Sequence, residues 1–135
     1  MRTLLLDTNI VSYLLKQAAQ AELYEPHLRD SRLAISFVNV AELYRWAIER
    51  KWSLLRRAVL EEKLRNYLVI PYDNAICQKW AEVKSISGLN ASDADAWIAA
   101  TALRHDLPLV SHNKKHFENI PNLNLIAEEE GRLRA

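Results

Sequence analysis

The stretch Leu4-Leu5-Leu6-Asp7 places a carboxylate directly after three apolar residues near the start of the chain. A short apolar run of this kind predicts a buried strand of a parallel sheet, here over residues 2–6. A carboxylate at the end of a buried strand is costly to desolvate unless a positive charge meets it. No Lys or Arg lies within three residues of Asp7, so the sequence shows no local partner.

Two further acids stand next to apolar segments in the same way. Glu42 follows Val40-Ala41, and Asp95 precedes the run Ala96-Trp97-Ile98-Ala99-Ala100. Carboxylates brought together repel one another, and a divalent cation is the usual means of holding them. The three acids therefore predict a site for Mg²⁺, with Mn²⁺ as the alternative ion.

Each acid also has a local explanation that the sequence leaves open. Asp7 could cap the helix that follows it, and Glu42 falls on the polar side of a helical wheel, as a solvated glutamate would. Ser92-x-x-Asp95 resembles a capping box. Asp93 lies two positions from Asp95, so the two cannot point to one ion from a regular helix, and Asp95 is expected to be the more inward.

Composition narrows the class of protein. The chain has 135 residues, half of them hydrophobic, and is expected to form a single globular domain over residues 1–135. Its two glycines argue against a Gly-rich phosphate loop, and its single cysteine, Cys77, excludes a disulfide framework. No apolar run reaches the roughly 18 residues of a membrane span. We expect a protein of the reducing cytoplasm with no membrane association.

The net charge of +1 argues against a broadly basic nucleic-acid binder, but the positive charges are clustered. A local basic rim beside an acidic pocket is one way to hold a phosphodiester, and ordinary solvated helix faces are the alternative. One group lies mid-chain and the other follows residue 103: Arg45, Arg50, Lys51, Arg56, Arg57; then Arg104, His105, His112, Lys114, Lys115, His116.

The chain alternates between predicted strands and predicted helices. Strands are expected at 2–6, 33–36, 69–70, 109–110 and 123–126. Helices are expected from a cap at Thr8 or Asn9 to Lys16, then over 19–29, 37–51, 53–67, 73–87, 92–105 and 113–118, with Ser36 and Asp73 as further caps. Such alternation implies a parallel sheet covered by helices on both faces. Sites in such sheets form at the carboxyl ends of the strands, where Asp7, Ser36 and the segment Ser111-His112-Asn113 would meet.

Four segments resemble the PIN-domain family, most closely the VapC toxins of toxin–antitoxin pairs. They are Leu5-Leu6-Asp7-Thr8-Asn9, Val40-Ala41-Glu42-Leu43, residues 95–103 and residues 109–117. The resemblance extends from residue 3 to about residue 126. It implies a three-layer α/β/α sandwich with a mostly parallel central sheet, and a metal-dependent endoribonuclease with Asp7, Glu42 and Asp95 as catalytic and metal-binding residues.

The last segment departs from the family pattern, because His116 stands where family members usually carry an acid before the Phe. Neutral imidazole is a poor ligand for Mg²⁺, so His116 is expected to contact a phosphate, pair with a carboxylate or lie on the surface. Asn113 is expected to orient Asp7 or a water molecule. Thr8, Asn9 and Ser111 are further candidates for contacts around the acids or with a phosphate.

The implied reaction is in-line hydrolysis of an RNA phosphodiester, leaving 5′-phosphate and 3′-hydroxyl ends, with transfer RNA among the candidate substrates. A catalytically weakened module that binds RNA or a protein partner is the alternative. A phosphatase of the haloacid-dehalogenase type would need a second Asp at position 9, where this chain has Asn9.

The middle helices carry more apolar residues than one inward stripe needs. These residues are Tyr44, Trp46, Ile48, Trp52, Leu54 and Leu55. We expect part of this surface to bind another chain, either a cognate antitoxin or a second copy in a homodimer. Core packing is the alternative for any one of them.

Overall fold

The predicted N-terminal strand forms as β1 (Thr3–Leu6) and occupies the middle of a five-stranded sheet. The computed structural model describes residues 1–89 and 91–128, so Asn90 and residues 129–135 of the expected single domain lie outside the described residues. The strand order is β3-β2-β1-β4-β5, and every neighbouring pair is parallel. The remaining strands are β2 (Arg32–Ser36), β3 (Leu68–Ile70), β4 (Leu109–Val110) and β5 (Leu125–Ile126).

The strand order places a topological switch point at β1. The chain proceeds outward from β1 through β2 to β3 and then crosses to β4 on the opposite side of β1. In open parallel sheets a crevice opens beyond the carboxyl ends of the strands at such a point. Asp7 follows β1 and Ser111 follows β4, so both stand at the mouth of this crevice.

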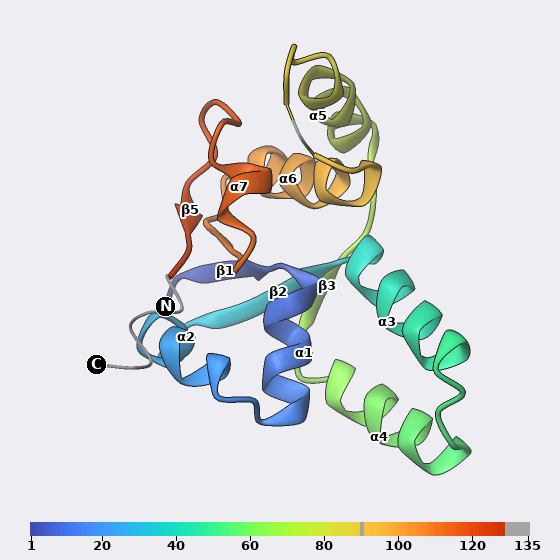
Figure 1. Ribbon diagram of the computed structural model, residues 1–135. Coiled ribbons are helices and arrows are strands. Elements are labelled where there is room, and N and C mark those ends of the chain that lie inside the picture. The colour runs from blue at the N-terminus through green and yellow to red at the C-terminus, as the bar shows by residue number, and fades with distance from the viewer. Residues whose placement is uncertain (90, 129–135) are drawn as a thin grey trace.

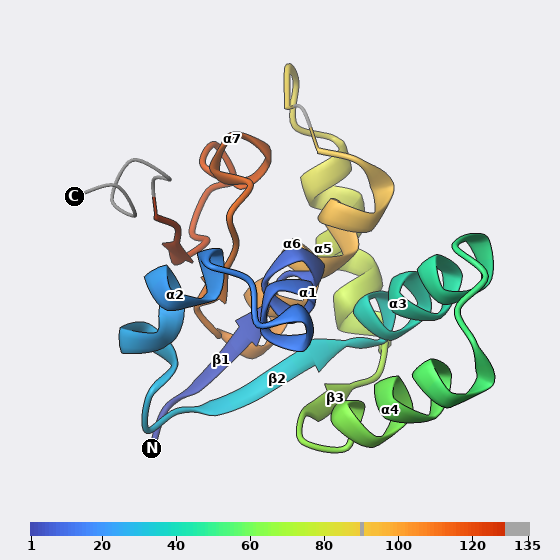
Figure 2. The same cartoon turned by 60° about the horizontal axis from the view of Figure 1, so that its bottom comes forward.

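Helices cover both faces of the sheet, which confirms the predicted three-layer sandwich (Figures 1 and 2). Alternation along β1 divides the core, because Leu5 packs into one cluster while Leu4 and Leu6 pack into the other. Figure 1 shows α5, α6 and α7 on one side of the sheet and α1, α2 and α4 on the other. The helices are α1 (Thr8–Lys16), α2 (Gln20–Leu28), α3 (Phe37–Glu49), α4 (Leu54–Leu64), α5 (Asn74–Lys84), α6 (Asp93–His105) and α7 (Lys114–Phe117).

The caps of these helices follow the sequence with one correction. Ser36 and Asp73 are N-caps as predicted, and Ser36 forms a full capping box with Asn39. Thr8 and Asn9 are not caps: Asp7 is the N-cap of α1, and its side chain accepts a hydrogen bond from the Thr8 N–H. The extended backbone of Asp7 lets it end the strand and begin the helix at once, which leaves Thr8 inside the first turn.

Most other boundaries lie within two residues of the prediction. The two exceptions are α4, which ends three residues before the predicted 67, and α5, which ends three residues before the predicted 87. Exposed polar residues follow each helix directly: Arg65 and Asn66 after α4, and Ser85 after α5. The described residues contain no helix long and apolar enough to cross a membrane.

The first prediction concerns β1. Leu5 is fully buried in the central strand, so Leu5→Ala should lower the free energy of unfolding by about 2–5 kcal/mol, through lost burial and the cavity that remains. Leu55→Ala is the matched control, because Leu55 is 77% exposed and its loss should cost no more than about 0.5 kcal/mol. Urea unfolding of the two variants measures the difference. Equal losses would contradict the placement of Leu5 in the core.

Candidate active site

Asp7 is the most deeply buried acid of the site, with 3% of its surface exposed. Its Oδ1 accepts from the Thr8 N–H at 2.8 Å, and its Oδ2 accepts from the Ser111 hydroxyl at 2.7 Å. The Ser111 contact joins residues 104 positions apart, and it exists because β4 lies directly beside β1. Ser111 was expected to contact either the acids or a phosphate, and in the structure it donates a hydrogen bond to Asp7.

Glu42 reaches the site through a chain of hydrogen bonds that links α3 to α1. The Thr8 hydroxyl donates to Glu42 Oε1 at 2.7 Å and accepts from Asn39 Nδ2 at 2.7 Å. Asn39 Oδ1 accepts in turn from both the N–H and the hydroxyl of Ser36. Glu42 is therefore held by Thr8 and half-buried, not solvated as its helical periodicity alone suggested.

Asn39 is a residue of this site that the sequence patterns did not single out. It is fully buried, and its amide fixes the Thr8 hydroxyl that holds Glu42. The pattern Ser36-x-x-Asn39, which forms the capping box of α3, was the signal that could have found it.

Asp95 lies in the first turn of α6 and points inward, as predicted. Its side chain is 14% exposed, whereas that of Asp93 is 76% exposed and pairs with Lys84. Ser92 is the N-cap of α6 and its side chain accepts from the Asp95 N–H, so the local explanation holds in part: the Asp95 carboxylate pairs with His116 and does not complete the expected capping box. The two explanations are compatible, because capping uses the backbone of Asp95 and leaves its carboxylate for the site.

His116 pairs with Asp95, which is one of the three alternatives that the sequence left open. The imidazole Nδ1 lies 2.9 Å from Asp95 Oδ2. Asn113 contributes its backbone N–H, which donates to the Ser111 hydroxyl at 3.0 Å and so supports the bond to Asp7. Among the described residues, by contrast, the Asn9 side chain forms no hydrogen bond, so its expected role at the site stays a prediction.

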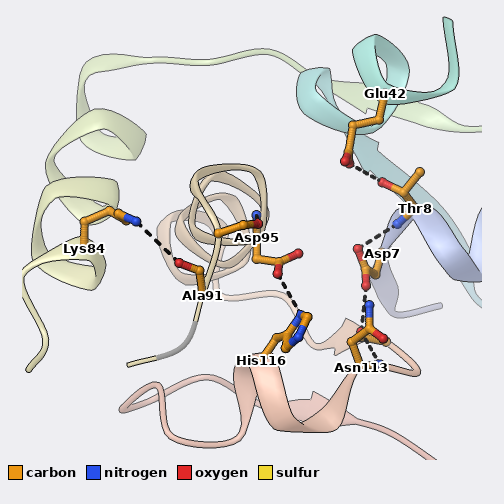
Figure 3. Close-up of polar contacts among 10 residues, drawn as sticks. Asp7, Thr8, Glu42, Lys84, Ala91, Asp95, Asn113 and His116 are labelled. Atoms are coloured by element: carbon orange, nitrogen blue, oxygen red, sulfur yellow. Dashed lines mark hydrogen bonds and ion pairs between the residues drawn. The ribbon is translucent and has the colours of Figure 1, made fainter. Parts of the chain in front are cut away.

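The three carboxylates face a common space (Figure 3). The figure shows Asp95 and Asp7 on opposite sides of this space, with Glu42 approaching from α3, His116 from α7 and Asn113 from the turn between β4 and α7. Within residues 1–89 and 91–128 no three His, Cys, Asp or Glu side chains are close enough together to hold a metal ion as they stand. Each carboxylate instead binds a neighbour of its own: Ser111, Thr8 or His116.

Electrostatic interactions couple the acids. Burial, and to a smaller extent the charges of Asp95 and Glu42, raise the pKa of Asp7 to about 6, against hydrogen bonds from Ser111 and Thr8 that lower it. Burial and the charge of Asp95 also raise the pKa of Glu42, while Thr8 and Arg45 lower it. The site therefore concentrates negative charge that its own hydrogen bonds only partly offset.

Most of the predicted basic rim lies elsewhere or is already paired. Arg45 pairs with Glu49, Arg104 pairs with Asp73, and Arg56 lies 3.9 Å over the ring of Trp52. The segment from His112 to His116 is the part of the rim that adjoins the acids.

Comparison with known proteins agrees with this geometry. Residues 4–123 match the PIN domain family. The chain belongs to the PIN-domain family. It is 35% identical over 126 residues to ribonuclease VapC1 of Haemophilus influenzae strain R2866, covering 88% of this chain and 92% of that relative. This places the PIN domain of the present chain among VapC-type proteins.

Solved structures of toxin–antitoxin pairs carry the same PIN fold. VapBC2 from Rickettsia felis, bound to a DNA fragment from its promoter, matches with a TM-score of 0.81 and 25% identity, covering 94% of this chain and 99% of that one. VapBC-1 from nontypeable Haemophilus influenzae matches with a TM-score of 0.74 and 28% identity, covering 93% and 97%. The matches span nearly all of this chain, so the fold assignment rests on the whole domain.

The donor set of this PIN domain suits a hard divalent cation. Mg²⁺ prefers oxygen ligands and is usually held by one or two carboxylates, with water molecules and substrate phosphates completing its coordination. Asp7 is buried, and no Lys, Arg or His among the described residues forms an ion pair with it. A carboxylate whose pKa is raised by burial, and to a smaller extent by two neighbouring acids, fits a position that a cation would stabilise.

The second prediction concerns the pH dependence of this PIN domain without metal. The folded protein holds the Asp7 proton with a pKa of about 6, against an ordinary value of 3.8, so ionisation of Asp7 opposes folding. The free energy of unfolding should therefore fall by up to about 3 kcal/mol as the pH rises from about 4 to about 7. Asp7→Asn cannot ionise and should lose this part of the decline.

Urea unfolding in EDTA, at both ends of that pH range, measures the effect. The raised pKa of Glu42 acts in the same direction in both proteins, so the difference between them isolates Asp7. Identical pH slopes for the wild type and Asp7→Asn would contradict the burial of an ionisable Asp7 carboxyl.

Proposed function

We infer that the protein is a ribonuclease of the VapC type, the toxin of a toxin–antitoxin pair. The observation that carries this inference is that the carboxylates of Asp7, Glu42 and Asp95 face one common space beside the end of β1, the central strand of the sheet. The 35% identity to ribonuclease VapC1 supports RNA as the substrate, with transfer RNA among the candidates.

We propose that Asp7 and Asp95 hold one Mg²⁺ or Mn²⁺ ion, with Glu42 bound to it directly or through water. When bound, such an ion activates a water molecule for attack and offsets the negative charge of the phosphodiester. The hydrogen bonds of the site then position the acids: Ser111 fixes Asp7, and Thr8 fixes Glu42. In-line attack would leave 5′-phosphate and 3′-hydroxyl ends.

His116 takes a positioning role in this proposal. Its contact with Asp95 Oδ2 restricts the rotamer of Asp95 and leaves Oδ1 outside this hydrogen bond. A hydrogen bond to the remaining oxygen is a common way to orient a metal-binding carboxylate. The site therefore works with three acids, and a histidine stands where an acid is usual.

The third prediction tests the activity with a matched pair of variants. Asp95→Asn should reduce RNA cleavage by at least about a hundredfold, because it removes charge that holds the cation. Asp93→Asn makes the same change two residues away on the exposed side of α6 and should leave the rate within about twofold. Cleavage of total transfer RNA in Mg²⁺, read on a gel, measures both.

Metal removal gives an independent readout. Adding Mg²⁺ to the EDTA-treated wild type should raise its melting temperature by mass action, and Asp95→Asn should lose most of this increase. A wild type that binds RNA without cutting it, and that Mg²⁺ does not stabilise, would favour the alternative of a binding module over an enzyme.

We propose that the antitoxin docks on a groove between α1, α3 and α4. The groove has apolar walls and basic residues at its rim, which suits an amphipathic helix with acidic flanks. It is lined by Ser12, Leu15, Lys16, Leu43, Trp46, Trp52, Arg56, Val59, Leu60 and Lys63. Trp46 and Trp52 line the groove and also pack on the core. Of the other apolar residues of the middle helices, four are exposed but do not line the groove: Tyr44, Ile48, Leu54 and Leu55. Solved relatives of the same fold are complexes of toxin with antitoxin.

The fourth prediction compares two exposed valines. Val59→Asp places a charge in the groove and should weaken binding of the product of an adjacent antitoxin gene by at least about tenfold, because a carboxylate would be desolvated against apolar surface. Val69→Asp is the control, since Val69 is 44% exposed against 49% for Val59 and lies on the edge strand β3. Isothermal titration measures both affinities, and equal losses would contradict the groove.

The homodimer and the cytoplasmic location stay predictions. Sedimentation of the isolated chain tests the first of these, and a strict monomer would contradict it.

A further inference from the structure

Tyr24 on α2 is a buried polar residue to which the proposed reaction gives no role, and its exposed fraction is 0%. Its hydroxyl accepts a hydrogen bond from the Glu128 N–H at 3.1 Å and lies 2.5 Å from His112 Nδ1. The Ser111 carbonyl lies 3.5 Å from the same hydroxyl, at the long end for a hydrogen bond. One side chain of α2 therefore joins segments that lie between 87 and 104 positions further along the chain.

Two of these contacts fall on residues 111–113, which we call the β4–α7 turn. The turn holds the most deeply buried acid, because the Ser111 hydroxyl donates to Asp7 Oδ2 and is itself supported by the Asn113 N–H. The sheet fixes the start of the turn, since the Ser111 N–H donates to the Ile126 carbonyl of β5 at 3.0 Å. Past this point the turn leaves the sheet, and Tyr24 holds it from the side of α2.

The hydroxyl of Tyr24 adds an orientation that its ring alone does not supply. The His112 imidazole makes edge contacts with the rings of Tyr13 and Tyr24, at centroid distances of 5.7 and 5.6 Å. Such contacts place a ring, whereas a hydrogen bond to Nδ1 also fixes its rotation. Burial raises the pKa of the Tyr24 hydroxyl above its ordinary value of 10.0, so the hydroxyl keeps its proton at neutral pH.

We propose that Tyr24 is a positioning residue: its hydroxyl holds the β4–α7 turn so that the Ser111 hydroxyl meets the Asp7 carboxylate. Asp7 accepts from two donors, and the other one, the Thr8 N–H, belongs to the next residue of the same helix start. Ser111 is therefore the donor whose place depends on distant parts of the chain. The effect on rate rests on the proposed ribonuclease activity, since a small displacement of a reacting group slows a reaction without unfolding the protein.

The variant Tyr24→Phe tests this role, because it keeps the buried ring and removes only the hydroxyl. With a fluorescent oligoribonucleotide of mixed sequence in Mg²⁺, kcat should fall about tenfold while KM stays within about twofold, since buried Tyr24 does not contact RNA. In a Ser111→Ala background the same change should lower kcat by no more than about twofold, because the bond through which Tyr24 acts is already absent. A tenfold loss in both backgrounds would overturn the proposal, and so would an unchanged kcat.

A second readout needs neither metal nor RNA. The Thr8 N–H donates to Asp7, and the Asn113 N–H donates to Ser111, so their amide resonances report the two ends of the bond that Tyr24 is proposed to hold. Both cross-peaks in a ¹H–¹⁵N spectrum should shift in Tyr24→Phe, although the aromatic ring is still in place. Unchanged cross-peaks would contradict the proposal whatever the activity.

Two control variants separate positioning from general effects. Tyr67→Phe removes the hydroxyl of a half-buried tyrosine between α4 and β3, and Leu28→Val trims a buried side chain on α2 itself. Both should leave kcat within about twofold and the Thr8 and Asn113 cross-peaks in place. The urea midpoint of each variant gives its loss of stability. If Leu28→Val lowers kcat as much as Tyr24→Phe, a loosened α2 explains the result and the positioning role fails.

This outcome is separable from that of the proposed function. If the wild type cuts RNA and Tyr24→Phe cuts it equally fast, the activity stands and the positioning role fails. If the wild type does not cut RNA, the activity fails, and the amide resonances of Thr8 and Asn113 still decide whether Tyr24 positions the turn.

Discussion

The burial of the Asp7 carboxylate at the end of the central strand is the constraint on which the rest of the site depends. A charge in this position must be met by donors, since no ion pair within the described residues meets it. One donor is the N–H of Thr8, which comes with the turn from β1 into α1. The other is the Ser111 hydroxyl, which comes only with β4 beside β1. The burial of Asp7 therefore depends on the strand order, because that order places β4, and with it Ser111, beside β1.

The starts of two helices help to stabilise the charges of Asp7 and Asp95. Asp7 is the N-cap of α1, and Asp95 lies in the first turn of α6. The first turn of a helix carries partial positive charge on its unpaired N–H groups, which stabilises nearby carboxylates. Residues that cap locally therefore also reduce the repulsion between acids that the fold brings together.

Short apolar runs and the order of the segments predicted the elements that depend on local pattern alone. Hydrophobic periodicity was enough to predict the strand at 2–6 and the inward orientation of Asp95. The rule that sites form at the carboxyl ends of strands was enough to predict that Asp7 and Ser111 lie close together. The contacts of Thr8 and Glu42 were not accessible in this way, because they depend on how α3 packs against α1, across 34 positions of the chain. Helical periodicity describes one helix in isolation, so it predicted that Glu42 is exposed to solvent.

The site residues of the last segment show the same limit. The resemblance to the PIN-domain family located His116, but its partner Asp95 lies 21 positions away and was one alternative among three. The resemblance also suggested Asn9, whose side chain forms no hydrogen bond with a described residue, and its role stays a prediction. Sequence patterns can identify the residues of a site, but they do not identify the hydrogen bonds between those residues.

The hydrogen-bond chain from Ser36 to Glu42 has a direction that cannot be reversed. A backbone N–H can only donate, so the atom of Asn39 that faces the Ser36 N–H must be its oxygen, and its nitrogen must therefore face Thr8. The Thr8 hydroxyl accepts from that nitrogen and donates its single proton to Glu42 Oε1. Aspartate would match Asn39 in shape but could not donate, so the far end of the chain would lose its order. A buried amide thus orients the hydroxyl that holds a distant carboxylate.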